Sequence, residues 1–344
     1  MKLRKLLPDK FTLALVCTVA FATLVPCRGS AAIVFNGLTD AAIALLFFLH
    51  GAKLSREAIV AGASNWKLHT AVFCSTFVLF PILGVALRPV LGEFVSPSLY
   101  LGVLFLCTLP STVQSSIAFT SMAKGNVPAA VCSASASSLL GIFLTPALVS
   151  LIVTNGSKSS GSSLRVVGDI VLQLFVPFIL GQLMRTKIGP WIDARKGLLK
   201  FVDQGSIVLI VYVAFSEAVN GGIWHELSIG SLAGIIAVNA ILLAVALVLT
   251  TYGSKWLGFS DADRTTIIFC GSKKSMASGI PMAKIIFGSH AGLIVLPIML
   301  FHQIQLMTCS VLAQRWALRA DSDPAKKANG AQPRRTEAAQ SANT

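Results

Sequence analysis

Long apolar runs separated by short polar segments make up most of the chain. Each run is close to the length of about 20 residues that a helix needs to cross the hydrocarbon core of a bilayer. The pattern predicts an all-α polytopic membrane protein. Its ten predicted membrane-spanning helices are residues 11–28, 33–52, 67–90, 98–123, 127–153, 170–186, 199–221, 228–256, 262–287 and 291–315. The segment 54–65 is expected to lie at the membrane surface.

The composition agrees with a membrane location. Of the 344 residues, 54% are hydrophobic and only 12% are charged, whereas soluble domains carry about 25% charged residues. The net charge of +14 does not indicate nucleic-acid binding, because the basic residues punctuate apolar runs and form no patch with aromatic residues. The seven cysteines show neither CxxC nor Cys/His spacing, so we expect neither a disulfide framework nor a metal site.

The distribution of Lys and Arg predicts the orientation of the spans. If residues 1–10 are cytoplasmic, most of the 28 Lys and Arg residues fall on the cytoplasmic side. The predicted outer segments hold Arg28, Arg88, Lys158 and Arg165. This asymmetry follows the positive-inside rule. We therefore expect both termini, including a disordered tail at 318–344, to be cytoplasmic, and the membrane to be the plasma membrane, which in a bacterium is the inner membrane.

The first span could be mistaken for a secretory signal peptide. MKLRK precedes its apolar run and RGSAA follows it, as in cleaved signals. The apolar run is long for a signal, however, so we expect residues 11–28 to remain in the mature protein.

Two interrupted spans occupy matching places in the two halves of the chain. The segment STVQSSIAFTSMAK (111–124) aligns with GSKKSMASGIPMAK (271–284), and each lies in the fourth of five spans. Five spans per half make the halves inverted repeats, here 11–153 and 170–317, with 154–169 as the connection. Broken segments at matching places in inverted repeats point to a transporter binding site. The alternative is that their small residues only allow close helix packing.

Two adjacent lysines lie inside the second of these segments. Lys273 and Lys274 belong to the span 262–287, and a lysine at the centre of a spanning helix costs about 2.5–3.5 kcal/mol. They could instead extend their ammonium groups to an interface, but they lie deep in the span. Their position therefore favours a functional role.

Several stretches of the chain resemble those of a known family. The stretches GLTDAAIALLFFLHGAKLSREA, LPSTVQSSIAFTSMAKGNVPAAVCSAS and FCGSKKSMASGIPMA are similar to those of the bile acid:sodium symporter family. The closest resemblance is to the branch with solute carrier family 10 member 7 and bacterial sodium-dependent transporters, over about residues 11–317. The resemblance implies ten helices in two inverted five-helix repeats and a core domain that rocks against a panel domain. It also implies that spans four and nine unwind and cross near the midplane.

The resemblance also implies where sodium would bind. Sodium-coupled members hold one ion with a Ser-Asn pair on span four, hydroxyls on span five and a Glu on span nine. The pair corresponds here to Ser115 and Ser116, and Ser133 or Ser135 offers the span-five hydroxyl. Any retained sodium ion would therefore lie near Ser115, Ser116 and Ser133.

The span-nine ligands of the family are largely missing. The Glu position falls on Phe269 and a Gln of the second sodium site falls on Lys273. Lys273 is therefore expected either to hold the place of sodium permanently or to carry a proton. Lys274 is expected to face an anionic substrate. Candidate counter-charges inside spans are Asp40, Asp203 and Glu217; the alternative is that they lie at the membrane interfaces, since Asp203 and Glu217 are near the ends of span seven.

The predicted substrate and ion site combines hydroxyl, amide, imidazole and ammonium groups. It consists of Ser111, Thr112, Gln114, Ser115, Ser116, Ser133, Ser135, Ser272, Lys273, Lys274, Ser275, His302 and Gln303. The last pair of polar residues, His302 and Gln303, could instead form an ordinary interhelical hydrogen bond.

Three classes of function were compared. The favoured one is a secondary transporter that moves a small organic anion by alternating access, with the lipid bilayer as its environment and sodium as the only expected cofactor. The alternative is a membrane regulator or scaffold that transports nothing. An enzyme is disfavoured, because the chain has no HExxH, GxSxG or paired intramembrane Asp motif.

Overall fold

The computed structural model describes residues 10–53, 65–91, 95–153, 160–222 and 228–322. The regular structure of these residues is helical. The α-helices are α1 (Lys10–Leu24), α2 (Gly29–Lys53), α4 (Trp66–Cys74), α5 (Phe80–Ala86), α6 (Arg88–Leu91), α7 (Pro97–Thr108), α8 (Gln114–Met122), α9 (Val127–Val153), α10 (Ser160–Ala194), α11 (Lys196–Asn220), α13 (Ile229–Trp256), α14 (Asp261–Gly271), α15 (Met276–Phe287) and α16 (Ala291–Ser322). A π-helix, η2 (Ser75–Leu79), joins α4 to α5, and a 3-10 helix, η4 (Gly288–His290), joins α15 to α16.

The helices have the length and composition of a polytopic membrane protein, as predicted. Within the described ranges, seven helical segments are long and apolar enough to cross a membrane. Two shorter apolar helices, Lys10–Leu24 and Pro97–Thr108, fall inside the predicted spans 11–28 and 98–123 or overlap them. Ten spans in two inverted repeats therefore remain a prediction. The surface segment 54–65, apart from its last residue, and the tail from residue 323 onward lie outside the described residues.

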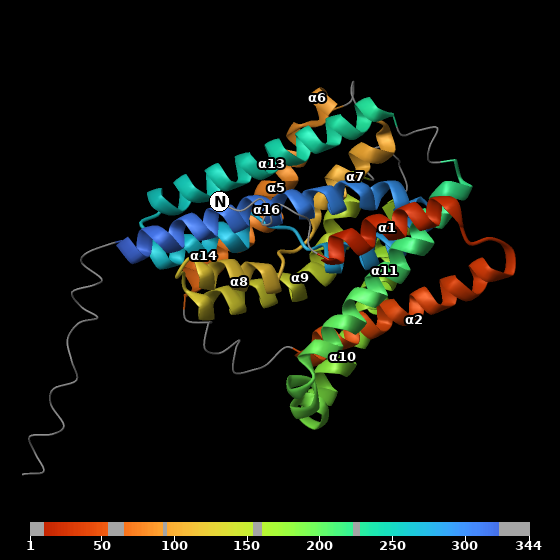
Figure 1. The fold of residues 1–344 in the computed structure, drawn as a ribbon, viewed down its shortest axis with the longest axis horizontal. Coiled ribbons are helices and arrows are strands. Elements are labelled where there is room, and N and C mark those ends of the chain that lie inside the picture. Colours follow the sequence, from red (N-terminus) through yellow and green to blue (C-terminus); the bar gives the residue numbers. More distant parts are fainter. Residues whose placement is uncertain (1–9, 54–64, 92–94, 154–159, 223–227, 323–344) are drawn as a thin grey trace, which may run out of the picture.

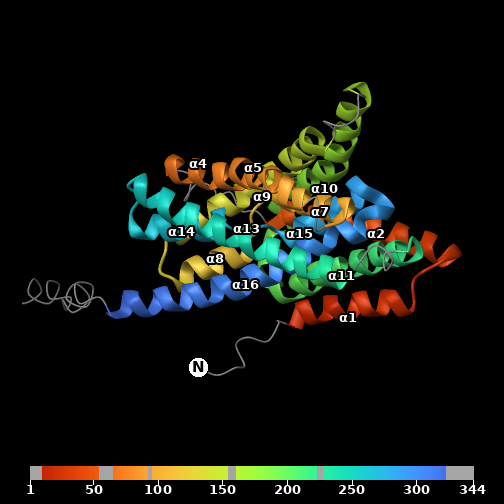
Figure 2. The same ribbon diagram turned by 90° about the horizontal axis from the view of Figure 1, so that it is seen from above.

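Four helices form one group at the side of the molecule. In Figures 1 and 2 the red helices α1 and α2 lie with the green helices α10 and α11. Glycines allow α2 and α10 to touch backbone to backbone. A Cβ on Gly51 would lie 2.0 Å from the carbonyl oxygen of Phe178, and one on Gly181 would lie 1.9 Å from that of Phe48. We call α1, α2, α10 and α11 the four-helix group and the remaining helices the larger group.

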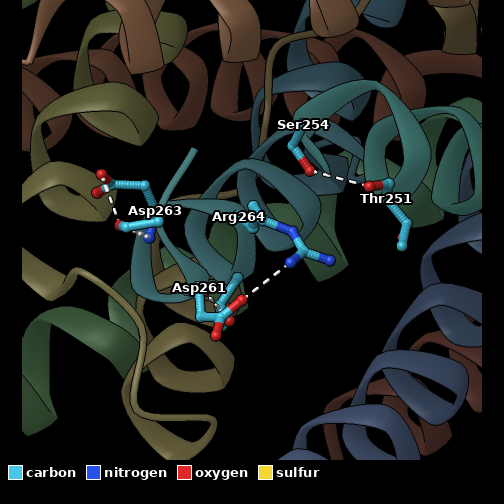
Figure 3. A network of polar contacts seen from close by, with 7 residues as sticks. Thr251, Ser254, Asp261, Asp263 and Arg264 are labelled. Atoms are coloured by element: carbon cyan, nitrogen blue, oxygen red, sulfur yellow. Dashed lines mark hydrogen bonds and ion pairs between the residues drawn. The ribbon is translucent and has the colours of Figure 1, made fainter. Parts of the chain in front are cut away.

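Polar contacts hold the corner between α13 and α14 in the larger group (Figure 3). Arg264 donates to Asp261 at 2.9 Å, and the hydroxyl of Ser260 accepts the backbone N–H of Asp263 as the N-cap of α14. Asp263 also accepts from Asn126, in the connection between α8 and α9, at 2.8 Å. These contacts fix where α14 begins and thereby direct its other end toward the centre of the molecule.

Candidate functional site

Two helix breaks meet inside the larger group. One lies between α7 and α8 and the other between α14 and α15, within the two segments that the sequence marked as interrupted. The backbone N–H of Ser275 donates to the carbonyl oxygen of Pro110 at 2.8 Å. The hydroxyl of Ser116 donates to the carbonyl oxygen of Phe269 at 3.0 Å, and the hydroxyl of Ser111 donates to the carbonyl oxygen of Cys270. Side chains of the first break therefore satisfy carbonyls at the end of α14 that have lost helical partners.

The π-helix η2 leaves a free carbonyl group nearby. The N–H of Phe80 donates to Ser75, five residues back, and so does not reach Thr76. The next donor along the helix would be Pro81, which has no N–H. The carbonyl oxygen of Thr76 is therefore available to a group outside its own helix, as is common at π-bulges.

The end of α7 frees two more carbonyl oxygens. The N–H of Ser111, four residues after Cys107, donates to the hydroxyl of Ser137 at 3.0 Å and not to the helix. Pro110 brings no N–H, and the chain turns away after Leu109, whose backbone is extended. The carbonyl groups of Cys107 and Leu109 thus point out of the helix end, where they need donors.

Lys274 supplies the donors for all three carbonyl groups. Its Nζ donates to Thr76 at 2.6 Å, to Cys107 at 2.8 Å and to Leu109 at 2.7 Å. The side chain is buried, and Nζ also lies 4.3 Å from the ring centroid of Phe80. An ammonium has three N–H groups, so this one is saturated. It joins the α4–α5 bulge to the end of α7.

The backbone of Lys274 is fixed as well. The side-chain amide of Gln305, on α16, accepts from the N–H of Lys274 at 2.9 Å and donates to its carbonyl oxygen at 2.9 Å. Gln305 is fully buried. The sequence shows Gln305 in one polar run with His302 and Gln303, but only the latter two were included in the predicted site. A buried glutamine inside an apolar helix was the available signal, because such a group requires partners.

Lys273 has a very different environment. It is also fully buried, but its Nζ has no hydrogen-bond partner among the described residues. It lies 4.2 Å from the ring centroid of Phe119 and 5.5 Å from that of Phe269. The sequence led us to expect the substitute for sodium at Lys273. In the structure it is Lys274 whose ammonium contacts carbonyl groups.

A cavity of about 690 Å³ lies between the four-helix group and the larger group. On one side it is lined from α1, α2, α10 and α11. On the other it is lined from α9, α16 and the N-terminal ends of α8 and α15. Of the predicted site residues, it is lined by Thr112, Gln114, Ser115, Ser135, Ser275 and His302.

Other predicted site residues do not line this cavity. Ser111, Ser116, Ser272, Lys273 and Lys274 are buried behind its wall in the larger group. The expectation that Lys274 faces a substrate in the cavity is therefore not met in this structure.

Ser133 and Gln303 also have partners elsewhere. Ser133 shares a 2.7 Å hydrogen bond with His69 Nδ1 and lines a separate cavity of about 210 Å³. Gln303 accepts from Thr12 of α1 at 2.7 Å. The region proposed for a retained sodium ion is thus split between two cavities. Around Ser115 it consists of a chain of hydroxyls, in which Ser115 donates to Thr112 at 2.8 Å.

The acidic residues proposed as counter-charges to the two lysines do not serve that purpose. Asp203 pairs with Lys53 and Glu217 pairs with Lys284, while Asp40 is exposed on α2. That hypothesis was wrong because it considered only depth along a span and not which face each carboxylate occupies. Among the described residues no cluster of His, Cys, Asp or Glu could hold a metal ion.

The wall of the cavity also contains charged residues that the sequence analysis did not select. They are His50, Lys53, Asp193, Lys196 and Lys200, and they lie beside Asp203, which the sequence had suggested only as a counter-charge. All come from the four-helix group, whereas the larger group adds His302 of α16 to the residues that line the cavity. The signal of the three lysines in the sequence was the same Lys and Arg excess that was read as topology.

Comparisons with known proteins agree with the resemblance seen in the sequence. A model of the SBF-like CPA transporter family matches residues 9–318. The chain is 59% identical to "Uncharacterized protein PA2026" of Pseudomonas aeruginosa, over 92% of this chain and 95% of that protein. It is 55% identical to "Putative symporter YfeH" of Escherichia coli K12, over 96% and 99%. It is 31% identical to "Sodium/bile acid cotransporter 7" of Danio rerio, over 88% and 91%.

Proposed function

Because the chain belongs to the SBF-like CPA transporter family, which is of the bile acid:sodium symporter type, we propose that it moves a small organic anion across the membrane by alternating access. The family is one of transporters, and the relatives from Escherichia coli and Danio rerio carry the names of a symporter and a cotransporter, not of enzymes. The chain is thus a multi-pass transporter. The anionic substrate and the transport cycle are what we propose beyond that.

The proposed cycle uses the two helix groups as the panel and core domains. We take the ten spans, the inverted repeats 11–153 and 170–317 and the cytoplasmic termini as parts of this proposal. The position of the cavity between the groups supports it, because a relative movement there would close one entrance and open another.

The observation that carries the anion proposal is the composition of the cavity wall. The N-terminal ends of α8 and α15 both contribute to it, through Gln114 and Ser115 and through Met276 and Ala277. The N-terminus of α8 has no side-chain cap, so its first N–H groups can bind a ligand. The positive ends of helix dipoles favour negative charge. A carboxylate or a similar group would therefore be held at this end of the cavity.

The second part of the proposal concerns the coupling ion. We propose that Lys274 takes the place of part of a sodium site, because its ammonium collects three carbonyl groups that the broken helices leave free. A fixed cation would make transport depend less on external sodium than a true sodium site would. Lys273 has no such acceptors, so we no longer propose it as the stand-in.

Uptake by liposomes tests the transporter proposal. The purified protein is reconstituted and exposed to a mixture of small carboxylates, and the internal content is measured by mass spectrometry against empty liposomes. We expect at least one anion to accumulate. In the variant Ser135→Trp the indole would fill the cavity and abolish uptake.

Ala136→Trp is the matched control. Ala136 is the next residue on α9. It is exposed and does not line the cavity between the two helix groups, so uptake should persist. If no anion accumulates, or if both variants are equally active, the proposal is contradicted. The first result would favour a regulator or scaffold.

A further inference from the structure

The helix α11 follows the space between the two groups from an open end to a closed end. Near its start, Lys200, Asp203 and Ile207 line the cavity. Further along, Ala214 is fully buried, and α11 packs against α15, η4 and α16 of the larger group. The space between the groups is therefore wide at one end of α11 and absent at the other.

At the closed end the helices touch without intervening side chains. Gly292 is the second residue of α16. A Cβ placed on it would lie 2.6 Å from the Cβ of Ala218 and 2.8 Å from the carbonyl oxygen of Ala214. No solute can pass between backbones at this separation, which leaves the cavity sealed on this side.

An ion pair spans the same closed end. Lys284 of α15 donates to Oε2 of Glu217 on α11, and Asn36 of α2 donates to Oε1 at 3.0 Å. The side chains of Lys284 and Glu217 are only 9% and 19% exposed. Both carboxylate oxygens are thus satisfied, one from the larger group and one from the four-helix group.

The ion pair at the open end has a different geometry. Lys53 and Asp203 both belong to the four-helix group, on α2 and α11. That pair moves with its own group and cannot hold the two groups together. Of the two pairs on α11, only Glu217 with Lys284 must break if the groups separate at the closed end.

We infer that Glu217, Lys284 and Asn36 form a gate that closes the cavity at the end opposite to Lys53 and Lys200. The inference rests on the proposed alternating access. When the gate opens, the two charges separate into water, which compensates most of the lost attraction. An ion pair is therefore suited to a contact that must break and re-form in every cycle. At Gly292 the two helices only have to move apart, because no hydrogen bond or ion pair is described there.

Side-specific thiol labelling tests the gate without a substrate. A parent variant carries Ser135→Cys in the cavity, with the exposed Cys17 and Cys74 replaced by Ala. A membrane-impermeant maleimide is added to either side of oriented vesicles. In the parent, labelling should be fast from the side of Lys53 and slow from the opposite side.

Breaking the pair should raise the slow rate. In Glu217→Gln, and separately in Lys284→Gln, we expect labelling from the opposite side to increase about tenfold, which corresponds to about 1.4 kcal/mol. The double variant Glu217→Lys with Lys284→Glu should return the rate to that of the parent. Asp261→Asn, which breaks an ion pair within α14, should leave it unchanged.

The outcomes separate the gate from the transport proposal. If opposite-side labelling is measurable but equal in the parent, in both single variants and in the charge-swapped variant, the gate is overturned and alternating access stands. If no folded variant is ever labelled from the opposite side, alternating access fails, and the gate fails with it.

Discussion

Two neighbouring lysines in the same helix break have opposite environments. Lys273 and Lys274 are both buried. Lys274 donates three hydrogen bonds to carbonyl oxygens, whereas the ammonium of Lys273 lies against aromatic rings and has no hydrogen-bond partner among the described residues. Both residues lie in the non-helical segment between α14 and α15, and their contacts show that the two side chains point to different sides of it. One residue therefore reaches the bulge between α4 and α5, while the other reaches the rings of Phe119 and Phe269.

The difference shows that burial alone does not identify a cation site. A buried ammonium needs acceptors that are not already satisfied, and broken helices are a source of free backbone acceptors in a membrane. Lys274 lies at three such acceptors. The cation–π contacts of Lys273 contribute only about 0.5–2 kcal/mol toward the cost of burying its charge.

Removing the ammonium of Lys274 should have the largest effect. In Lys274→Met the three carbonyl oxygens remain buried without donors, and each buried acceptor left without a partner costs about 1–3 kcal/mol. We expect a large fall in the midpoint of thermal unfolding in detergent, measured by intrinsic fluorescence. A midpoint within the error of the native protein would show that these carbonyl groups find other donors.

The same change one residue earlier should have a small or opposite effect. Lys273→Met keeps most of the volume of the side chain and removes an ammonium without acceptors. Replacing a buried charge by a well-packed apolar side chain is often neutral, or stabilising by about 1–4 kcal/mol. We expect the midpoint to stay or to rise in the same assay. A fall as large as that of Lys274→Met would mean that Lys273 has partners in a state not seen here.

Much of the fold could be predicted from the apolar runs. The predicted ranges 127–153 and 228–256 coincide with α9 and α13 to within a residue. The breaks in 98–123 and 262–287 could also be predicted, because Pro110 and a cluster of small polar residues cannot continue an apolar helix. Local composition determines features of this kind.

The partners of the lysines could not be predicted in the same way. Thr76 and Lys274 are 198 residues apart, and the free carbonyl of Thr76 depends on a π-turn before Pro81. Carboxylates such as Glu217 could be located by depth but not by the face they occupy. The pairing of Glu217 with Lys284 follows only from how the two helix groups pack.

The claim that Lys274 occupies the place of a sodium ion can be tested by removing its side chain. In Lys274→Ala the three carbonyl oxygens would surround a space that a small cation can enter. A ligand that binds only the folded state raises its stability. We predict that the thermal midpoint of Lys274→Ala rises by roughly 2 °C or more in sodium chloride compared with an equal concentration of choline chloride. The native protein and Lys273→Ala should show no such difference. Equal midpoints of Lys274→Ala in the two salts, or the same sodium effect in all three proteins, would contradict the claim.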